Sequence, residues 1–357
     1  MKKKVTIQDI ADALGISRNT VSKAINNSDG LADATRERIL QKALEMGYKQ
    51  FSYFSVLSGN GANPPPSLCF AAEAAGVVNE IALFTTTFLT QSHFASPMLD
   101  KLQRDLSQVG YTLNTHRITV EERRQLVLPH TFNRERVAAI LCVEMFDRAY
   151  DEMVCGLGLP TLFVDGPPKI TGESLPSDQL YMENIPAISR FIHDMLHQGK
   201  TRIGFLGNYE HCQSFFERYT AFRCAMLLAN QPVDEAFIIK SNSIEELTQG
   251  LSSLREMPDV FLCANDFVAV DAANILRGLG IKVPADVGLC GFDDAPESRF
   301  VSLPLTTIHI HTQTMAFSAM QLLMTRIKEP SLDYRIAYTE SDLLYRASTN
   351  FADEKER

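Results

Sequence analysis

Between residues 80 and 346, short apolar runs alternate with amphipathic stretches that have helical spacing. The apolar runs include EIALFTT, VAAILCV and VFLCAND, and the stretches between them include MLDKLQRDLSQVGY and FVAVDAANILRGLG. This alternation predicts parallel sheets covered by helices. The region is long for one sheet, so we expect two α/β lobes. Ligands of such sheets bind at the carboxyl ends of the strands, which is where we expect a binding site.

The first 49 residues have a different pattern, which predicts three short helices around a small core. Thr6, followed three residues later by Asp9, predicts a capping box at the start of the first helix. Gly15 ends that helix, and Ser17 can cap a second one. The inward positions of the three helices are Ile7, Ile10, Ala11, Leu14, Val21, Ala24, Ile25, Ile39, Leu40, Ala43 and Leu44. The pattern therefore predicts an N-terminal all-α helix-turn-helix domain.

Composition shifts divide the chain into four parts. The expected boundaries are 1–49 for the helical head, 50–79 for a hinge segment and linker, 80–346 for the two-lobed core, and 347–357 for a charged tail. The sequence NGANPPPS marks the linker, since its prolines cannot continue a helix. We expect the first lobe to comprise 80–177 and 310–330, and the second lobe to comprise 178–309 and 331–346.

Charge is unevenly distributed along the chain. The formal net charge is −9, but residues 1–50 carry nine Lys or Arg and six Asp or Glu, which gives +3 for the head and −12 for the rest. This asymmetry indicates a basic head for a polyanion and an acidic body.

The seven cysteines are scattered, odd in number and without a C-x-x-C pair. This usage favours reduced thiols over a disulfide framework or a zinc site. No apolar leader or run of 18 apolar residues occurs, so we expect neither a signal peptide nor a membrane span. The expected compartment is the cytoplasm.

The order of these parts resembles the LacI/GalR family of bacterial transcription regulators. VTIQDIADALGISRNTVSKAINN and TRERILQKALEMGY are similar to the family's head. HQGKTRIGFLGN, ERYTAFRCAM, VFLCAND, VPADVGLCGFDD and PLTTI follow in the order of the family's core landmarks, and YTESDLLYRAS is similar to its last strand. The resemblance covers nearly the whole chain. It implies a periplasmic-binding-protein-like core behind a DNA-binding head.

In the family, the start of the second helix meets base edges in the major groove, and this position falls on Arg18, Asn19 and Lys23. The chemistry agrees, because Arg pairs with guanine and Asn with adenine through two hydrogen bonds each. The resemblance places the short donors Thr20, Ser22, Asn26 and Thr35 at phosphates, which position the protein without reading sequence. One head makes few contacts, so we expect a homodimer on a near-palindromic operator.

Leu57 aligns with the leucine that family members wedge into the minor groove. The surrounding segment departs from the family pattern, because Gln50, Phe51, Phe54 and Ser55 replace its usual residues. Two readings therefore stay open for Leu57: a wedge between base steps, or part of an aromatic patch that docks on the core.

The resemblance also implies a small-molecule effector, commonly a sugar or a related metabolite, in the cleft between the lobes. By position, the effector-binding residues are Arg218, Asp293, Asn265, Asp165 and Thr86. Carboxylates accept hydrogen bonds from paired hydroxyls while Arg and Asn donate them, as polyols require. The alternative reading of Asp293 and Asp294 is that they only cap the following turn. No cofactor is indicated.

An effector that binds one state of the core better shifts the protein between DNA-competent and incompetent forms. We therefore expect a transcriptional repressor, with a regulator that answers to a protein partner or corepressor as the alternative. An enzyme is not expected. HDMLH, from His193 to His197, carries Asp194 where a zinc protease needs glutamate, and no nucleotide-binding or nucleophile motif occurs. His309 and His311 are expected on a crossover strand.

Overall fold

The computed structural model describes residues 6–25, 78–86, 94–300 and 303–351, together with Thr35, Arg38, Ile39, Lys42 and Met46. The chain splits into two compact units, 1–71 and 72–357, and each is described by itself. The expected hinge segment, including Leu57, lies outside the described residues, as does Asn26.

The head contains two described helices, α1 (Ile7–Leu14) and α2 (Arg18–Ile25). The predicted capping box is present: the Thr6 hydroxyl accepts from the amide of Asp9, whose carboxylate accepts from the Thr6 amide at 2.8 Å. Gly15 ends α1 with φ +64°, a conformation that glycine adopts without strain. The core of the head is made of side chains with less than 3% exposure, namely Ile10, Ala11, Val21, Ala24 and Ile39. The predicted pattern of this small core is confirmed for the described residues.

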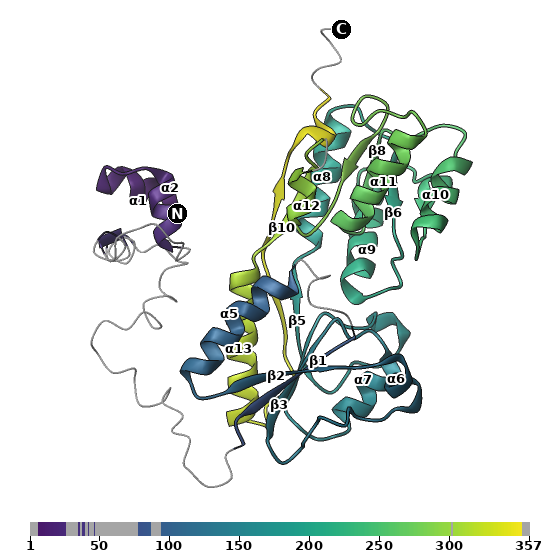
Figure 1. Ribbon diagram of the computed structural model, residues 1–357. Coiled ribbons are helices and arrows are strands. Elements are labelled where there is room, and N and C mark those ends of the chain that lie inside the picture. Colours follow the sequence, from purple (N-terminus) through teal and green to yellow (C-terminus); the bar gives the residue numbers. More distant parts are fainter. Residues whose placement is uncertain are drawn as a thin grey trace. The chain divides into compact units, whose positions relative to one another are not determined.

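The first lobe of the core is built on a six-stranded parallel sheet (Figure 1). Its strands are β1 (Glu80–Thr85), β2 (Thr112–Arg117), β3 (Val137–Val143), β4 (Thr161–Val164), β5 (Asp178–Met182) and β11 (Ile336–Thr339). They are ordered β11-β5-β4-β3-β1-β2, and every pair is parallel. The middle strands β1, β3 and β4 are almost wholly buried, as expected of apolar strands covered on both faces.

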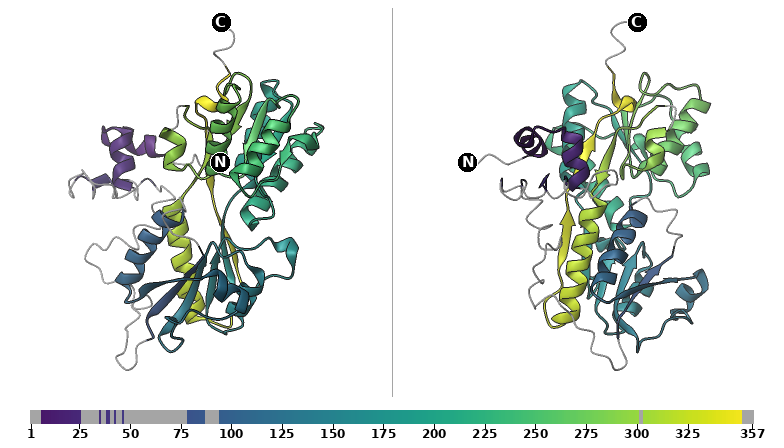
Figure 2. Two further views of the ribbon diagram at one scale, coloured as in Figure 1. Left: turned by 45° about the vertical axis from the view of Figure 1, so that its right-hand side comes forward. Right: turned by 60° about the vertical axis from the view of Figure 1, so that its left-hand side comes forward.

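Helices cover both faces of this sheet. Helices α5 (Ala95–Gln108) and α13 (Thr312–Lys328) lie side by side, although more than 200 residues separate them in sequence (Figure 2). Helices α6 (Val120–Gln125) and α7 (Arg148–Cys155) lie on the other side of the sheet in Figure 1. The α7 side chains Tyr150 and Val154 pack there on Phe84 and Phe163 of the strands.

The second lobe has a four-stranded parallel sheet in the order β7-β6-β8-β9. Its strands are β6 (Ile203–Leu206), β7 (Ile238–Ile239), β8 (Val260–Cys263) and β9 (Gly288–Cys290). Its helices are α8 (Ile185–His197), α9 (Gln213–Leu228), α10 (Ile244–Ser253), α11 (Asp266–Gly278) and α12 (Pro296–Phe300). The predicted α/β architecture with two lobes is confirmed.

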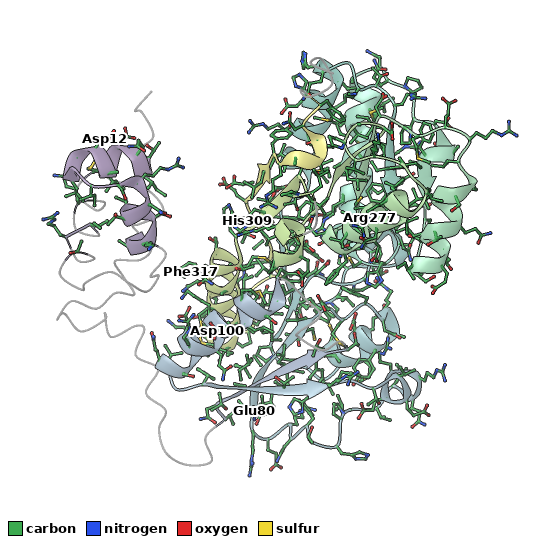
Figure 3. All side chains as sticks on the ribbon, turned by 45° about the horizontal axis from the view of Figure 1, so that its top comes forward. Asp12, Glu80, Asp100, Arg277, His309 and Phe317 are labelled. Carbon is green, nitrogen blue, oxygen red and sulfur yellow. The ribbon has the colours of Figure 1, made fainter. Side chains whose placement is uncertain are left out.

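The chain crosses between the lobes three times. It passes from β5 into α8, from β10 (Thr307–Ile310) into α13, and from β11 into β12 (Ser341–Leu344). Strands β10 and β12 pair antiparallel beside the second lobe, where His309 faces Asp342. His309 lies on this crossing strand as expected (Figure 3), whereas His311 was expected there but follows the end of β10 and precedes α13.

The lobe boundaries differ from the expected ones. Residues 178–182 and 336–339 were expected in the second lobe, but as β5 and β11 they extend the sheet of the first lobe. The reason is that Asp178, a residue type typical of loops, is buried inside β5. Asp178 is 0% exposed because its carboxylate accepts hydrogen bonds from Arg326 at 2.9 Å and from Arg335 at 3.0 Å. This pairing lets a polar sequence occupy the interior.

Candidate functional site

Helix α2 separates two kinds of side chain onto two faces. Val21 and Ala24 are buried in the small core of the head, whereas Arg18, Asn19 and Lys23 are exposed. The Ser17 hydroxyl caps the helix, since it accepts from the amide of Thr20 at 3.0 Å. The helix therefore presents two cations and an amide on its outer face, all of them hydrogen-bond donors. This is the chemistry that reads base edges.

The expected phosphate contacts are less uniform. The Thr20 hydroxyl lies 2.7 Å from the Ser17 hydroxyl, which gives it a role inside the cap. Ser22 and Thr35 are partly buried helical residues. Asn26 and Leu57 are not among the described residues, so their assignments stay predictions.

Arg218 is the centre of a second cluster, at the seam between the lobes. It is buried on α9 with 2% exposure. Its Nε donates to the Asn184 amide oxygen at 3.0 Å and one terminal nitrogen donates to the carbonyl oxygen of Ala264 at 2.6 Å. The other terminal nitrogen lies 3.5 Å from the Asp293 carboxylate, and the guanidinium stacks 3.5 Å from the Phe292 ring centroid. A buried Arg with such partners is rigidly placed.

Asp293 follows β9, and its φ of +108° is unusual for a residue that is not glycine. Burial is the main cause that raises the pKa of its carboxyl, to about 7. The positive charge of Arg218 lowers this pKa, and the negative charges of Asp266, Glu144 and Asp165 raise it. Asp294 behaves differently. Burial would raise its pKa, but hydrogen bonds from His309, Arg299 and Arg346 outweigh burial and hold that pKa well below its usual range. The two neighbouring aspartates therefore play different parts.

Asp165 follows β4 in the first lobe and touches the second lobe. Its carboxylate accepts from the Gly166 amide at 2.9 Å and from the Ser214 amide at 3.2 Å, in the first turn of α9. Helix α9 has no side-chain cap of its own, so Asp165 satisfies one of its free amides across the seam. Burial raises the pKa of Asp165. We name the set Asp165, Asn184, Arg218 and Asp293 the inter-lobe site.

The two other expected effector residues lie at the edges of this set. Thr86 follows β1, and its hydroxyl donates to the carbonyl oxygen of Glu144 at 3.0 Å. Asn265 follows Ala264, the residue that Arg218 contacts, and its side chain caps α11 by accepting from the Val268 amide at 3.0 Å. Asn265 therefore has a structural role in the described state.

Aromatic rings join the lobes beside the inter-lobe site. Phe146 follows β3, and its ring centroid lies 4.8 Å from that of His211, which precedes α9. His211 in turn lies 5.6 Å from Phe215 on α9. Burial lowers the pKa of His211. Phe292, the residue before Asp293, covers one face of Arg218.

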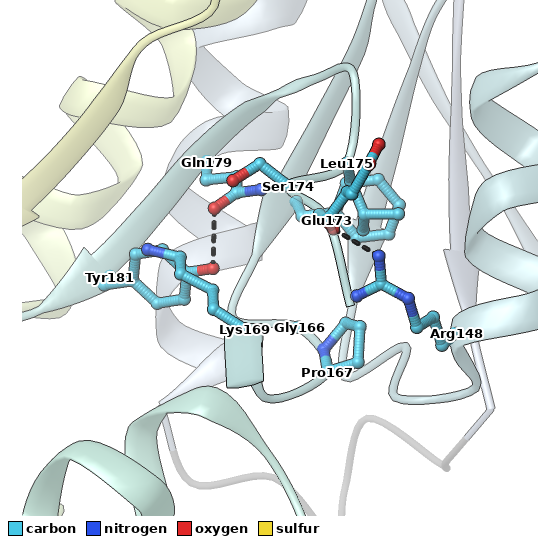
Figure 4. A pocket seen from close by; sticks show the side chains of 10 residues that line it. Arg148, Gly166, Pro167, Lys169, Glu173, Ser174, Leu175, Gln179 and Tyr181 are labelled. Carbon is cyan, nitrogen blue, oxygen red and sulfur yellow. Dashed lines mark hydrogen bonds between the residues drawn. The ribbon is translucent and has the colours of Figure 1, made fainter. Parts of the chain in front are cut away.

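A separate small hollow lies beside β5 in the first lobe (Figure 4). The Lys169 ammonium, on the short helix η2 (Lys169–Thr171), sits 4.5 Å from the Tyr181 ring centroid, and the Tyr181 hydroxyl donates to Gln179 at 2.9 Å. Arg148 closes the other side by donating to the carbonyl oxygen of Glu173. The hollow does not include Arg218 or Asp293, so it is distinct from the inter-lobe site.

The histidine side chains of the two sequence motifs lie close to another histidine or to a carboxylate. The Nε2 atoms of His193 and His197 lie 3.0 Å apart on α8, and His311 lies 3.1 Å from Asp342. Within the described part of the chain, no group of three or more His, Cys, Asp or Glu side chains is placed to hold a metal ion. None of the described helices is both long and apolar enough to cross a bilayer.

Sequence reasoning missed Asn184, His211 and Phe146. Asn184 follows β5, a strand that was not predicted from the sequence. Phe146 and His211 are notable only because their rings contact each other across the two lobes, and a sequence pattern does not show such a contact. Phe292 stands inside the GFDD landmark, next to Asp293, and this position is a signal that could have found it.

Comparison with known proteins supports both parts of the chain. Residues 6–50 match the model described as bacterial regulatory proteins, lacI family, and residues 192–349 match that of a periplasmic binding protein-like domain. The HTH-type transcriptional repressor PurR of Vibrio parahaemolyticus is 25% identical over 350 residues, which cover 96% of this chain and 97% of the relative. The HTH-type transcriptional regulator GalR of Lacticaseibacillus casei is 27% identical over 356 residues, covering 96% and 99%.

Solved structures share the fold. A complex of the transcriptional regulator CelR with cellobiose matches with a TM-score of 0.66 at 21% identity, covering 97% of this chain and all of that one. The lac repressor dimer bound to operator and an anti-inducer matches with a TM-score of 0.62 at 18% identity, covering 97% and 99%.

The helix-turn-helix head and the two-lobed core thus define a DNA-binding transcriptional regulator. The relatives are named as regulators and not as enzymes. The head thus matches the lacI family of bacterial regulatory proteins, and relatives along nearly the whole chain are transcriptional regulators.

Proposed function

We propose that this protein is a repressor that binds a near-palindromic operator as a homodimer and responds to a small, sugar-like molecule at the inter-lobe site. The observation that carries the proposal is the two-faced α2, whose outer face bears Arg18, Asn19 and Lys23 while its inner face holds the head together. Donors on the first turns of a rigid helix are what major-groove reading requires.

The core supports the second half of the proposal. Asn184 and Asp293 follow the carboxyl ends of β5 and β9, where ligands of α/β sheets bind, and Arg218 on α9 contacts both of them. The mix of carboxylates, a guanidinium, an amide and aromatic rings suits a polyol. Asp165 joins the lobes at the same place, so a ligand there can change how they meet.

The DNA half is tested by selecting sites from random duplex DNA with the purified full chain at about 0.15 M salt, because affinity depends on salt. We expect a near-palindromic consensus. Arg18→Ala should relax the preference at one base pair in each half-site and cost about 1–3 kcal/mol per head. Gln8→Ala, an exposed change on α1, is the matched control and should leave the consensus unchanged. Salt-sensitive binding to any DNA, with no consensus, would contradict the proposal.

The effector half is tested by measuring operator affinity with each member of a sugar library. Release from the operator by one sugar, abolished by Arg218→Ala, is the expected result. Tighter binding with a small molecule would make it a corepressor. If no member of the library changes operator affinity but a protein partner does, the result would contradict the sugar-like effector and favour the alternative function.

A further inference from the structure

One face of α9 carries the charges of the inter-lobe site. Ser214 and Arg218 are four residues apart, so they lie one above the other on the same side of the helix. The Asp165 carboxylate binds the Ser214 amide, and the Asp293 carboxylate lies 3.5 Å from Arg218. Two carboxylates, one from each lobe, therefore contact α9 about one helical turn apart.

A third carboxylate approaches from the first lobe. Glu144 precedes Phe146 by two residues, and the Phe146 ring packs on His211 at the entry to α9. The charges of Glu144, Asp165 and Asp266 all reach Asp293. Burial lowers the pKa of His211, which disfavours a compensating positive charge at this position. The largest charge effects on Asp293 come from one cation, Arg218, and from these three carboxylates.

The guanidinium is already committed. Each of its three nitrogens has a protein partner, and Phe292 covers one of its faces. An anionic ligand would have to compete with Asp293 for Arg218 while facing the other carboxylates. A hydroxyl group can share those acceptors without such a cost, and an ammonium group gains from them.

We propose that the inter-lobe site accepts polyhydroxylated effectors that are neutral or positively charged and rejects negatively charged ones, such as sugar phosphates and sugar acids. The proposal rests on the proposed effector function and adds a rule of charge to it. It orders related compounds: the amino sugar binds at least as tightly as the neutral sugar, and the phosphate of the same sugar binds worst.

The ligand arm of the test uses matched triplets on the full chain. Glucose, glucosamine and glucose 6-phosphate form one triplet, and galactose, galactosamine and galactose 6-phosphate form another. Binding is measured by calorimetry at pH 7.5. We expect a triplet that binds to show about a tenfold or greater loss of affinity for the phosphate. A phosphate that binds more tightly than its parent sugar would overturn the proposal.

The second arm needs no ligand. Asp293→Asn removes one negative charge and keeps the shape. Its urea midpoint relative to the unchanged core should therefore be higher at pH 8 than at pH 6, because only the aspartate is charged at the higher pH. Asp333→Asn, at an exposed position of the first lobe, is the control and should show no such difference between the two pH values. If Asp293→Asn lowers the midpoint equally at both pH values, the site is not over-supplied with negative charge and the proposal is wrong. If Asp293→Asn behaves as expected but no sugar binds, the sugar-like effector fails and the charge rule stands.

Discussion

Arg218 and Asp151 show two ways in which the core treats a buried charge. Arg218 is surrounded by an amide, a carbonyl and a carboxylate. Asp151, on α7, is 0% exposed, and neither of its oxygens has a hydrogen-bond partner among the described residues. Burial, with the charge of Asp147, raises the pKa of Asp151 to about 8 even though Arg148 and Arg123 are near. The charge of Arg218 is compensated by its partners, whereas Asp151 avoids a buried charge by keeping its proton.

Replacing Arg218 by Ala should destabilise the core as well as weaken effector binding. The change strands the Asn184 oxygen and the Asp293 carboxylate inside the protein, which typically costs about 3–5 kcal/mol. Arg223→Ala is the control on the same helix, because Arg223 pairs with Glu235 at a half-exposed position and should cost under about 1 kcal/mol. Urea unfolding of both variants measures the difference. Equal losses would show that the buried contacts of Arg218 stabilise the core no more than the exposed pair of Arg223 and Glu235 does.

Asp151 should make the core less stable as pH rises. Below about pH 4 the carboxyl is protonated in both states, and between pH 4 and pH 8 only the folded state keeps the proton. The free energy of unfolding should therefore fall over this range, by as much as roughly 3–5 kcal/mol. Asp151→Asn should flatten the profile, while Glu152→Gln, exposed on the same helix, should not. An unchanged slope in Asp151→Asn would mean that Asp151 is ionised in the folded protein.

At the scale of elements, Asp178 joins three segments that are distant in sequence. Its carboxylate on β5 accepts hydrogen bonds from the side chain of Arg326 on α13. It also accepts from both the side chain and the backbone amide of Arg335, which precedes β11. Arg326 also donates to the carbonyl oxygen of Pro330, so the turn between α13 and β11 is held as well. One buried carboxylate thus fixes the edge of the first sheet.

Asp178→Ala should cost about 3–5 kcal/mol, because it leaves Arg326 buried without its partner. Asp100→Ala on α5 is the control, since Asp100 and Arg104 form an exposed pair that should contribute under about 1 kcal/mol. Hydrogen exchange of the β5 amides locates the effect. Fast exchange in β5 with α5 unchanged is expected, and uniform loss of protection would contradict a local role.

The elements were largely predictable because they obey local rules. The capping box at Thr6, the turn at Gly15 and the inward Val21 and Ala24 all follow from spacing within one or two turns. The strand at 178–182 was not predictable, because its polar Asp178 is buried only through residues almost 150 positions away. The same reason hid Asn184 and His211. Arg218 and Asp293 were found through resemblance, and their effector roles stay predictions.

At the scale of the whole molecule, charge is separated between head and core. Residues 1–50 carry +3 and the rest −12. A basic head favours contact with the phosphate backbone of DNA, and the acidic charge of the rest of the chain opposes it.

DNA binding should therefore be strongly dependent on salt. Raising salt from 0.05 to 0.2 M should weaken operator binding about 10³–10⁵-fold if the dimer makes six to ten phosphate contacts. Lys101→Ala, on α5 of the core, is the control and should leave the slope of affinity against salt unchanged. Replacing a head lysine that contacts phosphate should reduce that slope by about one. A salt-independent affinity would exclude phosphate contacts as the main source of binding.

The three crossings between the lobes have a consequence for synthesis on the ribosome. The first lobe begins at residue 80, yet its sheet gains β11 and its face gains α13 only after residues 312–339 have been made. The second sheet, by contrast, lies within a single stretch that ends at β9. The sheet that starts first is therefore completed last. A premature stop shortly before residue 312 would leave the four strands of the second sheet in place. It would remove α13 and β11 from the first lobe and β12 from beside the second, so damage at the end of the gene would reach the sheet at the beginning of the core.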